Sequence, residues 1–332
     1  MKKLSYALPL LSAAILLVMV PPASAQAPAK AKAPAMMTKT PDGHPDMQGI
    51  WTNVTLTQLE RPEDLAGKAT LTDAEAKSYE QRDIQTGSID GDVNNRVLRN
   101  AGSAGTGAYN DLFIDRGSQL ARVDGKKRTS LIIDPADGRS PPITEAARQR
   151  IPGLMRGMNS LDDVKSRPLS ERCIIGFGST AGPPMLPVLY NNNYQIVQTA
   201  DTVMILVEMV HDVRVIRLNG THPAANIRFL LGDSIGHWDG ETLVVDTTNF
   251  RPEIRFRGSS ENLHVTERFR LVAPGQILYR ATIDDPTTFS KPWTLEYPFL
   301  ATDGPVYEYA CHEGNYAESA ILGSGSKAQG GR

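Results

Sequence analysis

A run of short apolar segments beginning at Tyr194 constrains the fold of this chain more than any other feature. The segments alternate with tight turns about every 8–12 residues, which is typical of all-β proteins. Dipeptides that end in glycine, such as Asn219-Gly220 and Asp239-Gly240, mark the turns. Strands are predicted near residues 194–199, 202–210, 213–218, 227–231, 234–238, 241–247, 263–271, 276–284, 293–300 and 306–312. Because closure removes exposed edges, we expect a mainly β, antiparallel, calycin-like (lipocalin-like) barrel over residues 188–316, with a β-sandwich as the alternative.

The N-terminus predicts a cleavable signal peptide at residues 1–25. Lys2 and Lys3 precede an apolar run over residues 8–20, and Ala23-Ser24-Ala25 supplies the small residues needed for cleavage. The apolar run is shorter than the roughly 20 residues that span a bilayer. The pattern therefore predicts a periplasmic or secreted protein without a membrane span.

The remaining segments predict a less regular organisation. Residues 26–40, rich in Ala, Pro and Lys, predict a disordered linker, and residues 317–332 a flexible tail. We expect an irregular N-terminal region over residues 41–187, with a first strand at 47–51. Thr72 and Glu75 form a capping-box pattern at the start of a helix that reaches about Asp83. A long loop at 86–110 precedes a hairpin turning at Asp124-Gly125 and a short helix at 144–148.

Cys173 and Cys311 are the two cysteines of the chain. An oxidising compartment and an even count favour a disulfide between them, with two separate buried thiols as the alternative. The formal net charge is −2. Nucleic-acid-binding proteins usually carry an excess of basic residues in a stripe or patch, and this chain has no such excess. We therefore expect no nucleic-acid partner.

Seven segments resemble a family of uncharacterised exported bacterial proteins. They are residues 45–51 (PDMQGIW), 190–195 (YNNNYQ), 208–216 (EMVHDVRVI), 237–250 (HWDGETLVVDTTNF), 257–269 (RGSSENLHVTERF), 284–289 (DDPTTF) and 307–316 (YEYACHEGNY). The resemblance implies a periplasmic or secreted protein, and it implies neither an activity nor any catalytic residue.

Common catalytic motifs are missing from the sequence. It contains no G-x-S-x-G, G-x-x-x-x-G-K-[ST], H-E-x-x-H or C-x-x-C, and no G-x-G-x-x-G after a strand. This argues against the common serine hydrolases, nucleotide enzymes and zinc proteases.

Strand periodicity places three polar residues on apolar rows. His211 alternates with Val207 and Val213, while Glu267 shares a face with Val265 and Phe269. Asp285 follows the row of Tyr279, Ala281 and Ile283 in the same way. Buried carboxylates and histidines are costly without partners. We therefore expect these residues to meet one another or to pair with Arg214, Arg257 or Arg268; His211 could also be a core histidine held by one hydrogen bond.

The end of the last predicted strand, residues 307–313, gathers two tyrosines, two carboxylates and a histidine. A disulfide at Cys311 would hold His312 rigidly, as a catalytic group requires; a surface cluster of polar residues is the alternative. The predicted catalytic residues are His211, Glu267, His312, Arg257 and Tyr309. The histidines act as bases, Glu267 is their partner, and Arg257 or Tyr309 stabilises negative charge.

These patterns predict a cofactor-independent enzyme, a lyase, isomerase or hydrolase, acting on a small, partly apolar molecule in a barrel pocket. A non-catalytic small-ligand-binding protein and an extracytoplasmic structural module are alternatives. A metal-dependent hydrolase is another, in which His211, His237 and His312 with Glu267 or Glu313 bind a zinc-type ion. No cofactor is predicted, and the sequence leaves the metal site and the oligomeric state open.

Overall fold

The computed structural model of this protein describes residues 38–87, 114–158, 165, 167–253, 256–259, 261–313 and 316. The predicted signal peptide, most of the predicted linker, most of the loop at 86–110 and the C-terminal tail lie outside these residues. The expectations for those segments therefore stay predictions.

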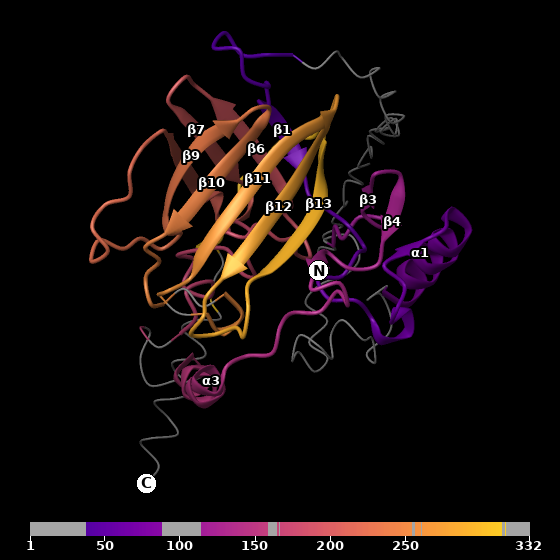
Figure 1. The fold of residues 1–332 in the computed structure, drawn as a ribbon, viewed down its shortest axis with the longest axis horizontal. Coiled ribbons are helices and arrows are strands. Elements are labelled where there is room, and N and C mark those ends of the chain that lie inside the picture. The colour runs from indigo at the N-terminus through magenta and orange to yellow at the C-terminus, as the bar shows by residue number, and fades with distance from the viewer. Residues whose placement is uncertain are drawn as a thin grey trace, which may run out of the picture. The chain divides into compact units, whose positions relative to one another are not determined.

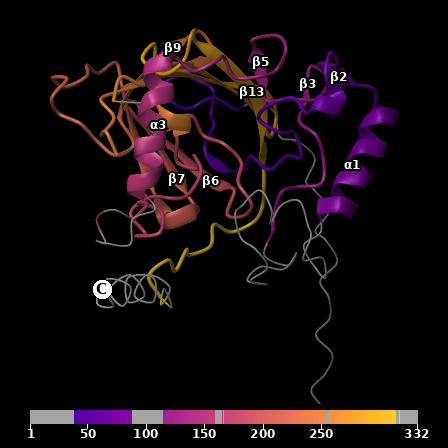
Figure 2. The same cartoon turned by 90° about the horizontal axis from the view of Figure 1, so that it is seen from below.

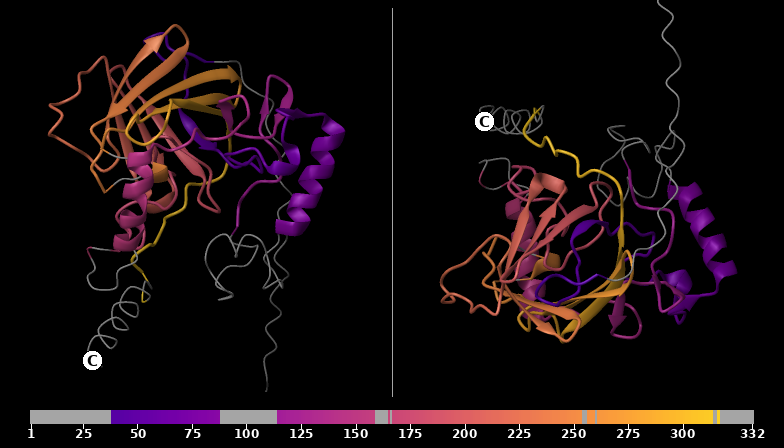
Figure 3. Two further views of the ribbon diagram at one scale, coloured as in Figure 1. Left: turned by 60° about the horizontal axis from the view of Figure 1, so that its bottom comes forward. Right: turned by 90° about the horizontal axis from the view of Figure 1, so that it is seen from above.

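A closed β-barrel forms the centre of the described chain (Figure 1). Nine of the described strands enclose it in the order β1-β6-β7-β8-β9-β10-β11-β12-β13, and β13 pairs back with β1. Their bounds are β1 Gly49–Thr52, β6 Asn193–Gln198, β7 Thr202–Val207, β8 Val213–Leu218, β9 Asp233–Asp239, β10 Thr242–Thr248, β11 His264–Ala273, β12 Gln276–Asp284 and β13 Trp293–Ala301. The right-hand view of Figure 3 looks down on this ring of strands. The predicted barrel is confirmed and the sandwich is excluded, whereas the calycin-like type stays a prediction.

The barrel is mixed, which corrects the prediction of a purely antiparallel sheet. β8 and β9 run parallel, and the other barrel neighbours run antiparallel. Parallel neighbours need a long crossover, and residues 219–232 provide it between β8 and β9. The strand predicted at 227–231 is therefore wrong, because this segment belongs to the crossover; Phe229 makes an isolated bridge to Phe250.

Two further strand predictions are wrong, one in its extent and one altogether. The strand predicted at 202–210 ends at Val207, because a short 3-10 turn (η4, Met209–His211) with positive φ at Val210 and His211 breaks it. Residues 306–312 form no strand; after β13 the chain runs without regular structure to Cys311.

Large side chains from alternating strand positions fill the barrel interior. β12 and β13 contribute Tyr279, Trp293, Tyr297 and Phe299, all fully buried. The largest other side chains buried to the same degree include Tyr194, Phe250, Phe269 and Met47. Burying each such side chain contributes roughly 1.5–3 kcal/mol, so the barrel core carries much of the stability of the fold.

The N-terminal region adds a helix and a small sheet beside the barrel. Helix α1 (Asp73–Gly87) begins with the predicted capping box, in which Thr72 N donates to Glu75 Oε2 at 2.9 Å and Glu75 N donates to Thr72 Oγ1 at 3.3 Å. A three-stranded sheet pairs β4 (Lys126–Arg128) with β2 (Thr70–Leu71) and β3 (Arg122–Val123). The hairpin at Asp124-Gly125 is confirmed, with positive φ at both turn residues.

Further elements accompany the barrel and the small sheet. β5 (Ile132–Asp134) pairs with β13, and η1 (Glu63–Leu65) and η5 (Phe256–Gly258) are single 3-10 turns. Helix α3 (Glu145–Met158) is longer than the helix predicted at 144–148. Figure 2 shows α1 beside the small sheet and α3 on a different side of the barrel. Within the described ranges, no helix combines the length and the apolar character needed to cross a bilayer.

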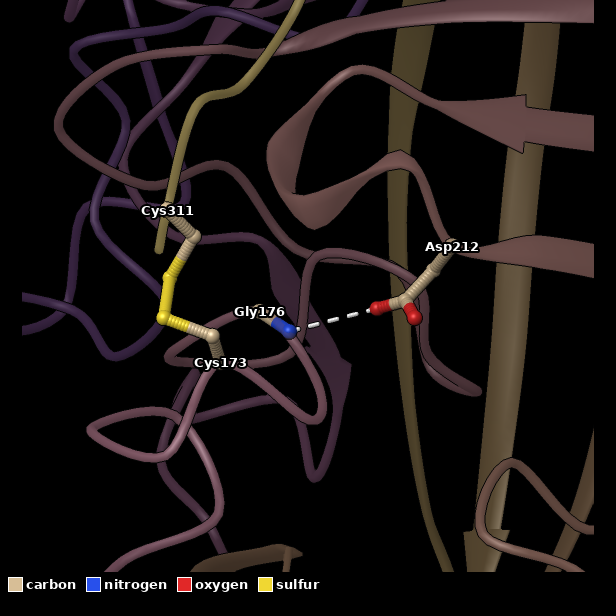
Figure 4. The surroundings of a disulfide bond; sticks show 4 residues. All are labelled: Cys173, Gly176, Asp212 and Cys311. Atoms are coloured by element: carbon tan, nitrogen blue, oxygen red, sulfur yellow. Dashed lines mark hydrogen bonds between the residues drawn. A yellow bond between two sulfur atoms is a disulfide. The ribbon is translucent and has the colours of Figure 1, made fainter. Parts of the chain in front are cut away.

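The predicted disulfide is confirmed. Cys173 and Cys311 are bonded, with Cα atoms 5.8 Å apart and a sequence separation of 138 (Figure 4). The bridge ties the segment after β13 to the loop region before β6. Gly176 N donates to Asp212 Oδ2 at 3.2 Å beside it, and burial raises the pKa of Asp212 more than this hydrogen bond and nearby His211 lower it.

Candidate functional site

Glu267 lies inside the barrel, as the alternation along β11 predicts. Its side chain is 0% exposed. Arg214 Nη1 and Nη2 donate to its two oxygens at 3.0 and 2.5 Å, and Tyr279 Oη donates to Oε1 at 2.8 Å. The prediction that His211 or His312 contacts Glu267 is therefore wrong, and the alternative partner Arg214 is correct.

The 3-10 turn at Met209–His211 explains why Arg214, and not His211, pairs with Glu267. Positive φ at two consecutive residues breaks the period-2 alternation between β7 and β8. His211 is consequently exposed, and Val213 is exposed by 49% on the outer face of β8. Arg214 takes the inward position instead, with only 1% of its side chain exposed.

The other predicted catalytic residues lie apart from Glu267. Arg257 Nη2 donates to Glu60 at 2.6 Å, Tyr309 packs partly buried against the core, and His312 is exposed beside the disulfide. Among the described residues, no hydrogen bond or ion pair joins any of the five predicted catalytic residues to another. The structure therefore does not bring the predicted catalytic set together.

The Arg214–Glu267 pair has the properties of a structural interaction. Burial alone would lower the pKa of Arg214, but the adjacent Glu267 carboxylate raises it by more. Tyr279, whose pKa is raised by burial and then by Glu267, also accepts a hydrogen bond from Met185 N at 2.8 Å. Tyr297 Oη donates to Met185 O at 2.7 Å. The buried network therefore holds the segment around Met185 inside the barrel.

Asp285 is likewise buried, as its place after the β12 row predicts. Its oxygens accept hydrogen bonds from the hydroxyls of Thr287 and Thr288 at 2.6 and 2.8 Å. These contacts order the connection between β12 and β13.

A second polar cluster lies on the outer wall of the barrel. Asp233 begins β9, Asp246 lies near the end of β10, and His264 begins β11. All three occupy outward positions, because their neighbours Ser234, Thr247 and Val265 face inward and are buried. Antiparallel pairing of β9, β10 and β11 brings them to one end of the barrel. Together with His222 they form what we call the histidine–aspartate row.

Hydrogen bonds run continuously along this row. His222, from the β8–β9 crossover, places Nδ1 2.6 Å from Asp233 Oδ2 and Nε2 2.9 Å from Asp246 Oδ1. His264 Nε2 lies 2.5 Å from Asp246 Oδ2. Arg217 on β8 completes the row with two hydrogen bonds to Asp233, at 2.8 and 3.0 Å. Asp246 is thus shared by two histidines.

The hydrogen bonds and charges within the row favour the ionised forms of Asp233, Asp246 and His264. The hydrogen bond to Asp246 raises the pKa of His264; partial burial opposes this, and the charges of Asp246 and Asp284 add to it. Burial alone would raise the pKa of Asp246, but its bonds to His264 and His222 lower it below the usual value. The pKa of Asp233 is lowered in the same way by Arg217 and His222, against burial. Both carboxylates are therefore ionised at neutral pH.

His264 is the more exposed of the two histidines in the row. Its side chain is 42% exposed, and its Nδ1 makes no hydrogen bond to any residue within the described part of the chain. Each nitrogen of His222, in contrast, has a carboxylate partner. One anchored nitrogen and one free nitrogen make His264 able to exchange a proton with a bound molecule.

The sequence shows the residues of the row without showing that they meet. His264 precedes the inward Val265, so alternation alone predicts that it faces outward. Asp246 likewise precedes the inward Thr247 on β10. Their contact depends on the register between strands, and that of His222 depends on the crossover; neither can be determined from periodicity.

The residues proposed as zinc ligands form no metal-binding group in the described part of the chain. Glu267 is inside the barrel, whereas His211, His237 and His312 are exposed. Over the described residues, no three or more His, Cys, Asp or Glu side chains are placed to hold a metal ion. The metal-dependent alternative therefore has no location among these residues.

Comparison of the chain with protein-family models, with curated proteins and with solved structures finds no match.

Proposed function

We propose that this protein is an exported enzyme that acts on a small molecule by general acid–base catalysis at the histidine–aspartate row, as a lyase, isomerase or hydrolase. The observation that carries this proposal is the arrangement of His264. Asp246 anchors its Nε2, while Nδ1 is free of protein partners among the described residues and the ring is partly exposed. The disulfide agrees with function outside the cytoplasm.

In this mechanism Asp246 orients the imidazole and stabilises the imidazolium that forms when Nδ1 takes a proton from the substrate. His264 then returns the proton to the product or to a leaving group. His222, held between Asp246 and Asp233, keeps the Asp246 carboxylate in place. A positioned acid–base group of this kind contributes about 10²–10⁴-fold to a rate.

Isotope transfer from solvent tests the proposal on a mixture of candidate substrates. The full-length mature protein is incubated with a small-molecule extract of periplasm in deuterium oxide enriched in oxygen-18. A lyase or isomerase introduces deuterium at carbon, and a hydrolase introduces oxygen-18. Mass spectrometry should find labelled compounds with the wild type and none with His264→Asn.

His237→Asn is the matched control. His237 is an exposed histidine on the outer face of β9, outside the row, so its variant should label the same compounds as the wild type. Labelling that persists in His264→Asn, or no labelling by the wild type, would contradict the proposed function. The second outcome would favour a row that only fastens the crossover to the barrel.

A further inference from the structure

The crossover that carries His222 also carries Arg228. Arg228 Nη1 donates to the backbone oxygen of Phe250 at 3.0 Å and to that of Glu261 at 2.9 Å. Two carbonyl groups therefore fix one terminal nitrogen, and with it the plane of the guanidinium. The crossover is itself held, because Phe229 N donates to Asn249 O at 2.9 Å and Asn249 Nδ2 to Pro223 O at 3.2 Å.

The opposite edge of the guanidinium is available. Arg228 Nε and Nη2 make no hydrogen bond to any described residue, and no carboxylate of that part of the chain forms an ion pair with this arginine. Nearby Arg251 differs, since Glu253 pairs with it at 2.7 and 3.3 Å. The Nε–Nη2 edge presents two parallel N–H groups, and this geometry matches the two oxygens of a carboxylate.

Arg228 lies near the start of β11, the strand that His264 begins. Glu261, whose carbonyl binds Arg228, is three residues before His264. Three residues span at most about 10 Å even when fully extended, and residues 261–262 form a turn that shortens this span.

We propose that Arg228 binds the carboxylate of a small organic acid, so that His264 acts on an atom a few bonds away. This inference rests on the proposed function and adds the substrate class to it. The carboxylates of Asp233, Asp246 and Asp284 repel an anion near His264. The guanidinium charge of Arg228, which no carboxylate of the described residues pairs with, offsets this repulsion.

Histidine ring signals provide the test, with protein carrying isotope-labelled histidine. Benzoate is the probe; benzamide has the same shape without the charge, and chloride is a simple anion. Benzoate should shift the His264 signals in a saturable way, whereas benzamide and chloride at equal concentration should not. Arg228→Gln should weaken benzoate binding at least about tenfold, as expected for losing hydrogen bonds to a charged group.

Arg251→Gln is the matched control, since Arg251 is already paired with Glu253, and it should leave benzoate affinity unchanged. Arg228→Lys keeps the charge and loses the planar fork, so its affinity should fall between those of the wild type and Arg228→Gln. An unchanged His264 signal pattern without ligand shows that each variant is folded. The inference is overturned if benzoate leaves His264 unshifted, if Arg228→Gln binds it as the wild type does, or if Arg251→Gln loses as much affinity.

Benzoate binding requires no turnover, so the two proposals fail separately. Binding that depends on Arg228, together with isotope transfer that does not depend on His264, would keep the anion site and remove the enzyme. Isotope transfer that depends on His264, without benzoate binding, would keep the enzyme and remove this substrate class.

Discussion

At the scale of single residues, the bond between His264 and Asp246 determines when the proposed base is charged. The hydrogen bond raises the pKa of His264 above its usual value of 6.5. Asp246→Asn removes the charged acceptor and leaves the partial burial, which disfavours the imidazolium. We expect the pKa of His264 to be lower in this variant than in the wild type, although the charge of Asp284 still raises it, as measured from its ring signals during an NMR titration.

Asp239→Asn is the control for this titration, because Asp239 is exposed on β9 and pairs with Arg268 rather than with a histidine of the row. It should leave the His264 titration unchanged. The same bond also links stability to pH. The raised pKa means that the contribution of the pair is complete below pH 6.5 and is lost as the pH rises through the folded-state value. An unchanged pKa for His264 in Asp246→Asn would show that the contact is not formed in solution.

At the scale of elements, the Arg214–Glu267 pair connects β8 to β11 through the barrel interior. Glu267→Gln keeps the shape of the side chain and leaves Arg214 buried without a counter-charge. Breaking a buried pair in this way costs about 3–5 kcal/mol. We expect urea unfolding to show a loss of free energy of unfolding of this size.

Glu253→Gln provides the comparison, since its pair with Arg251 is exposed and such pairs contribute about 0–1 kcal/mol. Replacing both buried partners, with Arg214→Met and Glu267→Leu, should recover much of the loss, because no charge is then left unpaired. A loss in Glu267→Gln no larger than that in Glu253→Gln would mean that the buried pair contributes little.

The same elements show which parts of the fold the sequence could predict. Regular alternation identified β6, β8, β10, β11, β12 and β13 and the inward position of Glu267, because a strand that stays in phase carries its side chains to fixed faces. It failed at His211, where two residues of positive φ break the phase. The parallel β8–β9 pair and the contacts of His222 depend on the path of the crossover, which has no periodicity.

At the scale of the whole molecule, the Cys173–Cys311 bridge joins the chain after β13 to the region before β6. In the chain-entropy model, a loop of the observed separation of 138 residues restricts the unfolded chain by about 5 kcal/mol. Cys173→Ser with Cys311→Ser should therefore lower the free energy of unfolding by up to that amount, measured in urea under oxidising conditions. The wild type treated with a reductant should lose a similar amount, and the double variant should not respond to the reductant. A thiol assay on denatured, unreduced wild-type protein should find no free cysteine; two free thiols would show that the bridge does not form.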